Sequence, residues 1–248
     1  MKKIIVIMTL IGALQTTVAQ GLALVEYADD TQKLNGLVTG NSGKKSPGVL
    51  VLPAWMGIDN EARTAALNLE KEGYIAFVAD IYGEGNVPAN RSEAGKIATA
   101  FKTDYALYQK RIQLALDQLQ KAGADPDKLA VIGYCFGGTG ALEAARGNLP
   151  VSGAVSIHGG LGKDATRANV ALKPKILVLH GADDASASEQ ILKDFRTELD
   201  EGKADWQMIY YANSKHTFTN PESPDYNEIM SKRSWRHTLM FLQELFDD

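Results

Sequence analysis

The pattern of apolar and polar positions along the chain predicts strands that alternate with helices. Four short, mainly apolar runs lack a polar side, as is typical of strands covered on both faces; they lie at 49–52, 75–79, 153–157 and 176–179. Helices are expected at 60–71, 92–121, 187–199 and 228–245, the second with a break near Lys102 and Thr103. This alternation predicts a mostly parallel sheet with helices on both faces.

Residues 22–39, which precede these runs, show a different pattern. Segments 22–27 and 33–39 alternate as strands do, and Asp29, Asp30 and Thr31 predict a turn between them. The hairpin gives the sheet an antiparallel N-terminal edge. A polar loop is expected at 41–48, a turn at 125–127 and a further strand at 206–211. The fold class is therefore α/β, and no repeat or linker divides the chain.

The first residues read as a secretory signal peptide. Lys2 and Lys3 form a short basic head, segment 4–14 is almost unbroken apolar sequence, and small residues precede a cut after Ala19 or Gln20. The apolar run is short for a membrane anchor, which is the alternative. The expected organisation is a signal peptide at 1–19 and a single domain at 20–248, without a stable membrane anchor after cleavage. Such a protein is periplasmic or secreted.

Composition narrows the function classes. The 248 residues are 45% apolar and carry a net charge of −4, which suits one globular domain. No basic cluster favours nucleic acid as a partner. No spacing of Cys and His resembles a zinc site, so neither a metal nor another cofactor is expected.

The segment Gly-Tyr-Cys-Phe-Gly-Gly at 133–138 follows an apolar β-branched run and precedes small residues that can begin a helix. This is the strand–turn–helix layout of a nucleophile elbow, with sulfur in place of the commoner hydroxyl. Cys135 is the only cysteine, so it cannot form an intramolecular disulfide. A buried structural Cys is the alternative.

A catalytic thiol needs a base and an acid that orients the base, expected in the order nucleophile, acid, histidine after successive strands. His158 and His180 precede the candidate acid, and His237 lies inside a predicted helix. His216 follows the last strand and is the candidate base. Asp183 and Asp184 both follow the strand at 176–179, and spacing alone barely separates them; the other of the pair would cap a turn or helix.

These stretches resemble the dienelactone hydrolase family of α/β-hydrolases. The matching segments are Gly-Tyr-Cys-Phe-Gly-Gly at 133–138, Ala-Asp-Ile-Tyr-Gly at 79–83, His-Gly-Ala-Asp-Asp at 180–184 and His-Thr-Phe-Thr-Asn-Pro at 216–221. The resemblance implies an α/β-hydrolase fold and a triad of Cys135, Asp184 and His216, preferring Asp184 to Asp183. It also implies an oxyanion hole formed by the backbone N–H groups of Trp55 and Phe136.

The resemblance implies a pocket that departs from the family pattern. The pocket positions are Ala54, Tyr82, Glu84, Phe218 and Asn220. Family members that open dienelactones carry Glu at the first of these positions, and Arg at the matching positions where this chain has Glu84 and Asn220. Neither replacement can give the bidentate contact that arginine makes with a substrate carboxylate. The departures therefore argue against dienelactone as the substrate.

The expected function is hydrolysis of a small-molecule carboxylic ester or lactone through an acyl-thioester on Cys135. Three alternatives stay open at this point. A non-catalytic binding protein could retain the scaffold, an acyltransferase could use an acceptor other than water, and a lone exported thiol could sense oxidants, although it has no resolving Cys.

Overall fold

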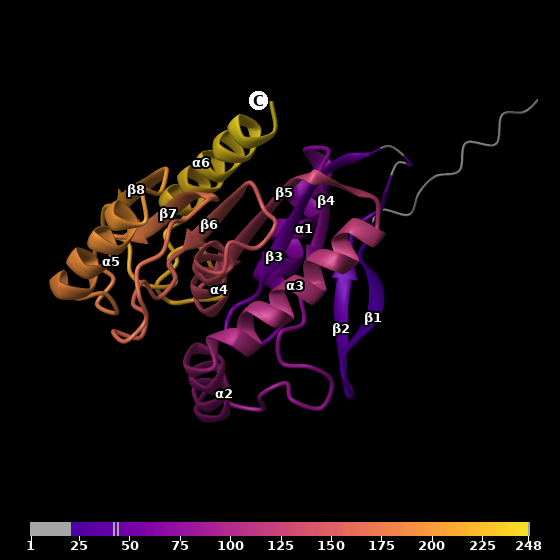
Figure 1. The fold of residues 1–248 in the computed structure, drawn as a ribbon, viewed down its shortest axis with the longest axis horizontal. Coiled ribbons are helices and arrows are strands. Elements are labelled where there is room, and N and C mark those ends of the chain that lie inside the picture. The colour runs from indigo at the N-terminus through magenta and orange to yellow at the C-terminus, as the bar shows by residue number, and fades with distance from the viewer. Residues whose placement is uncertain (1–20, 42, 44, 248) are drawn as a thin grey trace, which may run out of the picture.

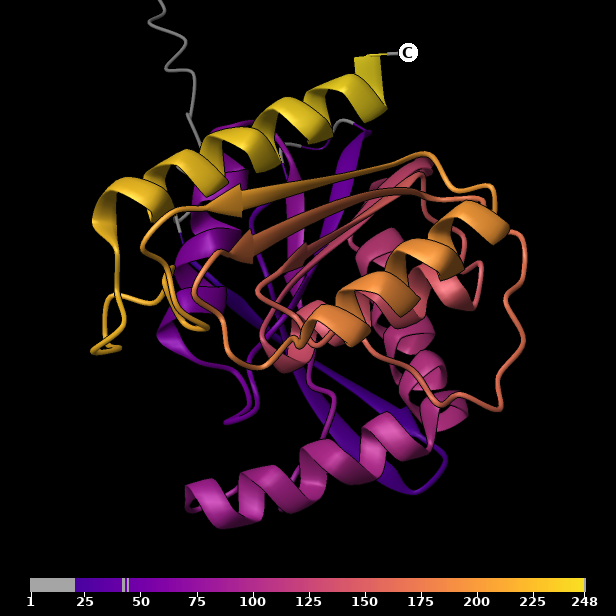
Figure 2. The same ribbon diagram turned by 90° about the vertical axis from the view of Figure 1, so that its left-hand side faces the viewer.

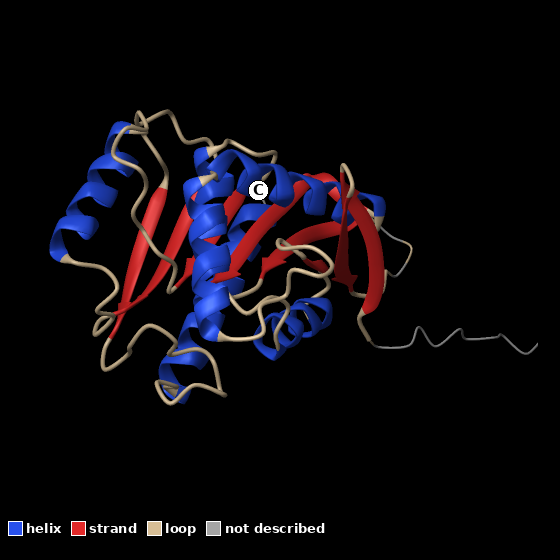
Figure 3. Cartoon of the chain, turned by 90° about the horizontal axis from the view of Figure 1, so that it is seen from below, coloured by secondary structure: helices blue, strands red, loops and turns tan. Residues whose placement is uncertain are grey.

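A computed structural model describes residues 21–41, 43 and 45–247, which form an eight-stranded sheet with helices on both faces (Figure 1). The expected signal peptide at 1–19 lies outside the described residues. Figure 3 shows the strands running between the two helical layers. The α/β fold class with a mostly parallel sheet is thus confirmed.

The sheet has the strand order β1-β2-β4-β3-β5-β6-β7-β8. β1 pairs with β2 and β2 with β4 in antiparallel fashion, and every later neighbour is parallel, as the hairpin and the alternating pattern predict. The bounds are β1 (Ala23–Asp29), β2 (Gln32–Val38), β3 (Ser46–Leu52), β4 (Ile75–Val78), β5 (Ala124–Tyr134), β6 (Gly153–Ile157), β7 (Lys175–Gly181) and β8 (Trp206–Tyr211).

The helices form two layers (Figure 2). One layer is α1 (Asn60–Lys71) and α6 (Glu228–Asp247); the other is α3 (Tyr105–Lys121), α4 (Phe136–Arg146) and α5 (Glu189–Glu201), with α2 (Arg91–Thr103) beside α3. Alternate residues of each buried strand face opposite layers, because successive side chains in a strand point to opposite faces.

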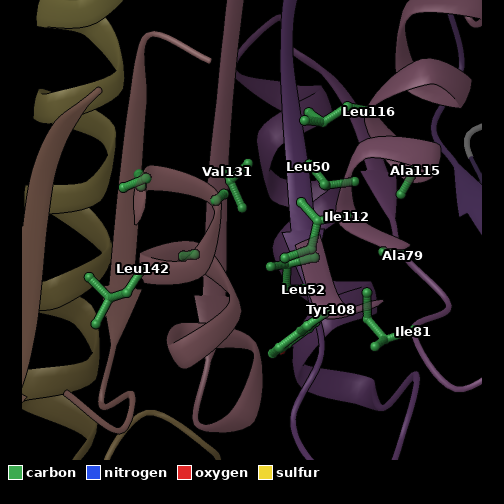
Figure 4. Packing of buried hydrophobic residues seen from close by; sticks show 14 of the residues in the cluster. Leu50, Leu52, Ala79, Ile81, Tyr108, Ile112, Ala115, Leu116, Val131 and Leu142 are labelled. Carbon is green, nitrogen blue, oxygen red and sulfur yellow. The ribbon is translucent and has the colours of Figure 1, made fainter. Parts of the chain in front are cut away.

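Strand β3 shows how this alternation builds two cores. Leu50 and Leu52 pack with Ile112 and Leu116 of α3 (Figure 4). The intervening residues of β3 face α1 and α6 on the other side. Complete burial of a Leu side chain contributes about 1.5–3 kcal/mol of transfer free energy, so β3 is anchored from both faces. The segment that follows β3 therefore begins at a position that both cores hold in place.

The break expected near Lys102 and Thr103 is confirmed. Helix α2 ends at Thr103, and Asp104 caps α3 by accepting a hydrogen bond from the N–H of Leu107 at 2.9 Å. One boundary differs from the sequence prediction. The turn expected at 125–127 lies inside β5, where the register with β3 shifts between the pairs Ser46–Ala124 and Gly48–Leu129. Pro126 cannot donate to a ladder, so strand pairing is interrupted there without ending the strand.

Candidate active site

Cys135 lies between β5 and α4 with φ 53° and ψ −111°, a conformation that L residues rarely adopt. Gly133 and Gly137, two residues before and after Cys135, are both required because the backbone of other segments lies close to them. A Cβ on Gly133 would lie 2.0 Å from the carbonyl oxygen of Gly137, and one on Gly137 would lie 2.1 Å from that of Leu52. The turn leaves the half-buried Cys135 at the N-terminus of α4.

The structure brings the three predicted side chains together from the carboxyl ends of β5, β7 and β8. His216 Nε2 lies 3.1 Å from Cys135 Sγ, and His216 Nδ1 lies 2.8 Å from Asp184 Oδ2. Asp184 Oδ1 accepts a hydrogen bond from the N–H of Ser186 at 2.9 Å. Asp183 is exposed, whereas the Asp184 side chain is buried. The geometry therefore selects Asp184 as the partner of the imidazole.

The electrostatics of these groups favour a charged imidazole. Burial opposes ionisation of Asp184, but hydrogen bonds from His216 and Ser186 outweigh it and hold the carboxyl pKa well below its usual range. Burial likewise opposes the charge on His216, but its hydrogen bonds to Asp184 and Cys135 raise its pKa to about 10. An imidazolium beside a sulfur can stabilise the thiolate and later donate a proton to a leaving group.

Two backbone N–H groups are available near the sulfur. Phe136 is the first residue of α4, and Trp55 lies just beyond β3. Among the residues that the structure describes, neither N–H donates to a protein acceptor. The hydroxyl of Tyr82 donates to the carbonyl oxygen of Trp55 at 3.0 Å, and its ring packs against Phe136 at a centroid distance of 5.4 Å. Tyr82 thus links the two segments that carry the expected oxyanion donors.

The structure places the five expected pocket residues in different parts of the molecule. Ala54 and Tyr82 line a small hollow with Phe136. Glu84 is exposed and accepts a hydrogen bond from Asn35 of β2 at 3.4 Å. Asn220 lines a cavity of about 330 Å³ between α1 and α6.

Phe218 is a correction to the expected pocket. It has no exposed surface, so it cannot contact a substrate in this structure. Its ring stacks on Tyr211 of β8 at a centroid distance of 5.2 Å and meets the edge of His158 at 5.7 Å. An aromatic residue two positions after His216 therefore packs beneath the site, where it supports the loop.

His158 precedes the candidate acid in the sequence, which argues against it as the base, yet it lies against the site. Its Nδ1 accepts a hydrogen bond from the N–H of Cys135 at 3.2 Å, and its ring lies 5.4 Å from that of His216. Burial, followed by the charge on His216, lowers the pKa of His158 to about 3, so its ring is neutral. The sequence does indicate that His158 lies near the site, because it directly follows β6 and side chains at that edge of a parallel sheet converge.

In the described part of the chain, no group of three or more His, Cys, Asp or Glu side chains could hold a metal ion. In the same residues, no helix is both long and apolar enough to cross a bilayer.

Comparisons with known proteins show the family to which the chain is similar. The sequence model of the dienelactone hydrolase family matches residues 34–246. A Bradyrhizobium protein named "Probable 2-oxo-3-(5-oxofuran-2-ylidene)propanoate lactonase" is 28% identical over 208 residues, which are 79% of this chain and 83% of the relative.

Solved structures extend the likeness to three dimensions. A dienelactone hydrolase-like promiscuous phosphotriesterase from metagenomic libraries is 31% identical, with a TM-score of 0.84 over 91% of this chain and 98% of that one. The structure named m3DLH is 30% identical, with a TM-score of 0.87 over 92% and 99% of the two chains. These matches span the sheet and the segments that carry Cys135, Asp184 and His216.

Proposed function

The chain belongs to the dienelactone hydrolase family of α/β-hydrolases, and on this premise we propose that it hydrolyses a carboxylic ester or lactone through an acyl-thioester on Cys135. The observation that carries the proposal is the continuous chain of contacts from sulfur to imidazole to carboxylate, with distances of 3.1 and 2.8 Å. These are the contacts that an activated nucleophile, a general base and an orienting acid require.

The proposed reaction has two halves. The Cys135 thiolate attacks the substrate carbonyl carbon, and the carbonyl π bond becomes an oxyanion held by the N–H groups of Trp55 and Phe136. The oxyanion collapses, the carbon–oxygen bond to the leaving group breaks, and His216 gives its proton to the departing alkoxide. His216 then takes a proton from water, whose oxygen attacks the thioester and releases the acid, returning the thiolate and imidazolium. Losing one oxyanion donor costs about 3 kcal/mol in comparable sites.

The residues at the family's substrate-binding positions support a substrate without a free carboxylate. Ala54, Glu84 and Asn220 carry no positive charge. Asn220 lines the cavity between α1 and α6, and Glu84 is held on the exposed side of β2. A small neutral ester or lactone needs no bidentate cationic partner.

The proposal is tested with a substrate panel on the protein lacking residues 1–19. The panel contains p-nitrophenyl acetate, γ- and δ-lactones and a neutral phosphotriester, the last because a structure 31% identical is described as a promiscuous phosphotriesterase. We expect turnover of the acetate with a stoichiometric burst of p-nitrophenol, and a mass increase of one acetyl group on Cys135.

The matched controls are Cys135→Ala and His216→Ala, both of which should abolish turnover. Full activity in either variant would eliminate the mechanism. Stoichiometric ligand binding without turnover by the wild type would favour a binding protein. Acceleration by added alcohols, with ester rather than acid as product, would favour an acyltransferase.

We further propose that the protein is exported, on the basis of its basic head and apolar segment. The N-terminal sequence of the protein isolated from a Gram-negative host should begin at Gln20 or Gly21, in the periplasmic or extracellular fraction. A cytoplasmic product that retains Met1 would contradict this.

A further inference from the structure

We propose that His158, Thr219 and Glu61 are positioning residues for the reaction at Cys135. Together they hold the strained peptide of the nucleophile and the loop that carries His216 in one arrangement. The inference rests on the proposed role of Cys135 as nucleophile. None of the three residues touches the sulfur through its side chain in the contacts described above, so their effect would pass through the Cys135 backbone and through the His216 loop.

The first contact is made at the backbone of Cys135. Its N–H group is shared between two acceptors, the carbonyl oxygen of Ile157 at 3.0 Å and Nδ1 of His158 at 3.2 Å. Cys135 occupies an unfavourable backbone conformation, which persists only where the surroundings enforce it. His158 itself has φ 40° and directs its ring toward this N–H. The nucleophile is thus restrained from the β6 side as well as by its own turn.

The direction of each hydrogen bond in the network can be assigned. Because Nδ1 of neutral His158 accepts from the Cys135 N–H, the single ring proton resides on Nε2. Nε2–H therefore donates to Thr219 Oγ1 at 2.7 Å, and the hydroxyl proton of Thr219 is free to go to Glu61 Oε1 at 2.6 Å. His158 and Thr219 each donate once and accept once, the Cys135 N–H begins the chain as a donor, and Glu61 ends it as an acceptor, so the hydrogen bonds have one consistent direction.

The same network reaches the catalytic base. Thr219 lies three residues after His216, and Phe218 between them packs against the His158 ring. His158 also meets the His216 ring edge-on at 5.4 Å. The Thr219 hydroxyl therefore pins the His216 loop to β6 through His158 and to α1 through Glu61. A displacement of that loop would change the distance between Nε2 and Sγ directly.

In a purely structural role, Glu61 would lower the stability of the fold. Within the described residues it has no ion-pair partner, and burial, with a smaller contribution from the nearby Asp59 and Glu222, raises its pKa to about 8. It also lines the cavity of about 330 Å³ between α1 and α6. A buried acid without a counterion lowers stability unless its hydrogen bonds are satisfied. Its one described side-chain contact is the Thr219 hydroxyl, which points to a role in orienting that group.

The decisive experiment compares Thr219→Val, which keeps the shape and removes the hydroxyl, with Thr219→Ser, which keeps the hydroxyl and removes a methyl group. Two quantities are measured: kcat and KM for p-nitrophenyl acetate, and the second-order rate of Cys135 alkylation by iodoacetamide. We expect Thr219→Val to lower kcat and the alkylation rate by about tenfold to a hundredfold, the cost of a small misplacement, with KM within about twofold. Thr219→Ser should recover most of both losses, even where its melting temperature falls.

A second pair covers the case in which Thr219→Val does not fold. Glu61→Gln keeps a neutral acceptor for the Thr219 hydroxyl, and Glu61→Leu removes it beside an existing cavity. Glu61→Leu should lower both kcat and the alkylation rate relative to the wild type, and Glu61→Gln should restore most of both.

Alkylation decides the positioning role independently of turnover. If the wild type hydrolyses no ester yet the Val and Leu variants still alkylate slowly, the proposed function fails and the positioning role stands. Wild-type alkylation and kcat in Thr219→Val or Glu61→Leu would overturn the positioning role. Equal losses in both members of a pair would do the same, because shape rather than hydrogen bonding would then be responsible.

Discussion

Replacing Asp184 by Asn tests the orientation of the catalytic imidazole with almost no change of shape. In the wild type, Asp184 Oδ1 accepts from the N–H of Ser186 and Oδ2 accepts from His216 Nδ1. An asparagine must keep its oxygen toward Ser186, since a backbone N–H can only donate. Its NH₂ group then faces His216 and donates to Nδ1.

That reversal puts the remaining ring proton of His216 on Nε2, facing Cys135 Sγ. The imidazole can no longer accept the thiol proton, and the buried negative charge that stabilised the imidazolium is gone. A triad whose histidine is held in the wrong tautomer loses about 10⁴ in kcat in a serine protease. Since a thiol is more acidic than a hydroxyl, we expect a loss of about 10³–10⁴ here, or roughly 4–5.5 kcal/mol at 1.36 kcal/mol per tenfold.

The assay is kcat/KM for p-nitrophenyl acetate, together with thiolate absorbance at 240 nm. The matched control is Asp183→Asn, because Asp183 is the exposed neighbour and engages Ser214 through its backbone N–H only. This control should stay within about twofold of the wild type, as exposed substitutions usually do. A loss of less than tenfold in Asp184→Asn, or an equal loss in Asp183→Asn, would refute the assignment of the acid.

Three further outcomes are expected. Phe218→Leu should lower the free energy of unfolding by about 1–2 kcal/mol through lost packing, with KM unchanged; a several-fold change in KM at unaltered stability would restore Phe218 to the pocket. Gly137→Ala should yield little folded protein by circular dichroism, because its Cβ would lie 2.1 Å from the Leu52 carbonyl oxygen; normal expression and melting would contradict the contact. Since the folded pKa of His216 is raised from 6.5 to about 10, its contribution to stability is complete below about pH 6.5 and is lost as the pH rises through 10. Urea unfolding at pH 6.5 and 10 should therefore show a larger loss for the wild type than for His216→Gln, and equal losses would oppose the pairing.

The fold follows from the sequence because its signals are local and repeated. Continuous apolar runs predict buried strands, and the hairpin between segments 22–27 and 33–39 predicts the antiparallel edge. One boundary is less accessible. Pro126 lies in an irregular part of β5 that looks like a turn in isolation. Its inclusion in the strand depends on pairing with β3, which local spacing does not encode.

The site could be predicted where chain order carries information. Cys135, Asp184 and His216 each follow a parallel strand, so their meeting at one edge was foreseeable. The place of His158 beside Cys135 cannot be predicted from motifs, because its contact is with a backbone N–H and no motif describes such a contact. Phe218 was misplaced because a position close to His216 in sequence does not reveal which side of the loop faces the core.

The order in which the catalytic strands appear has a consequence for biosynthesis. Cys135 follows β5 near the middle of the sheet, whereas His216 follows β8, the edge strand at the far end of the strand order. A nascent chain that has reached only β7 holds the sulfur without its base, and no fragment ending there can generate the thiolate by this route. Because the last strand of the described sheet delivers the base, the sulfur and the imidazole can meet only after β8 has been synthesised.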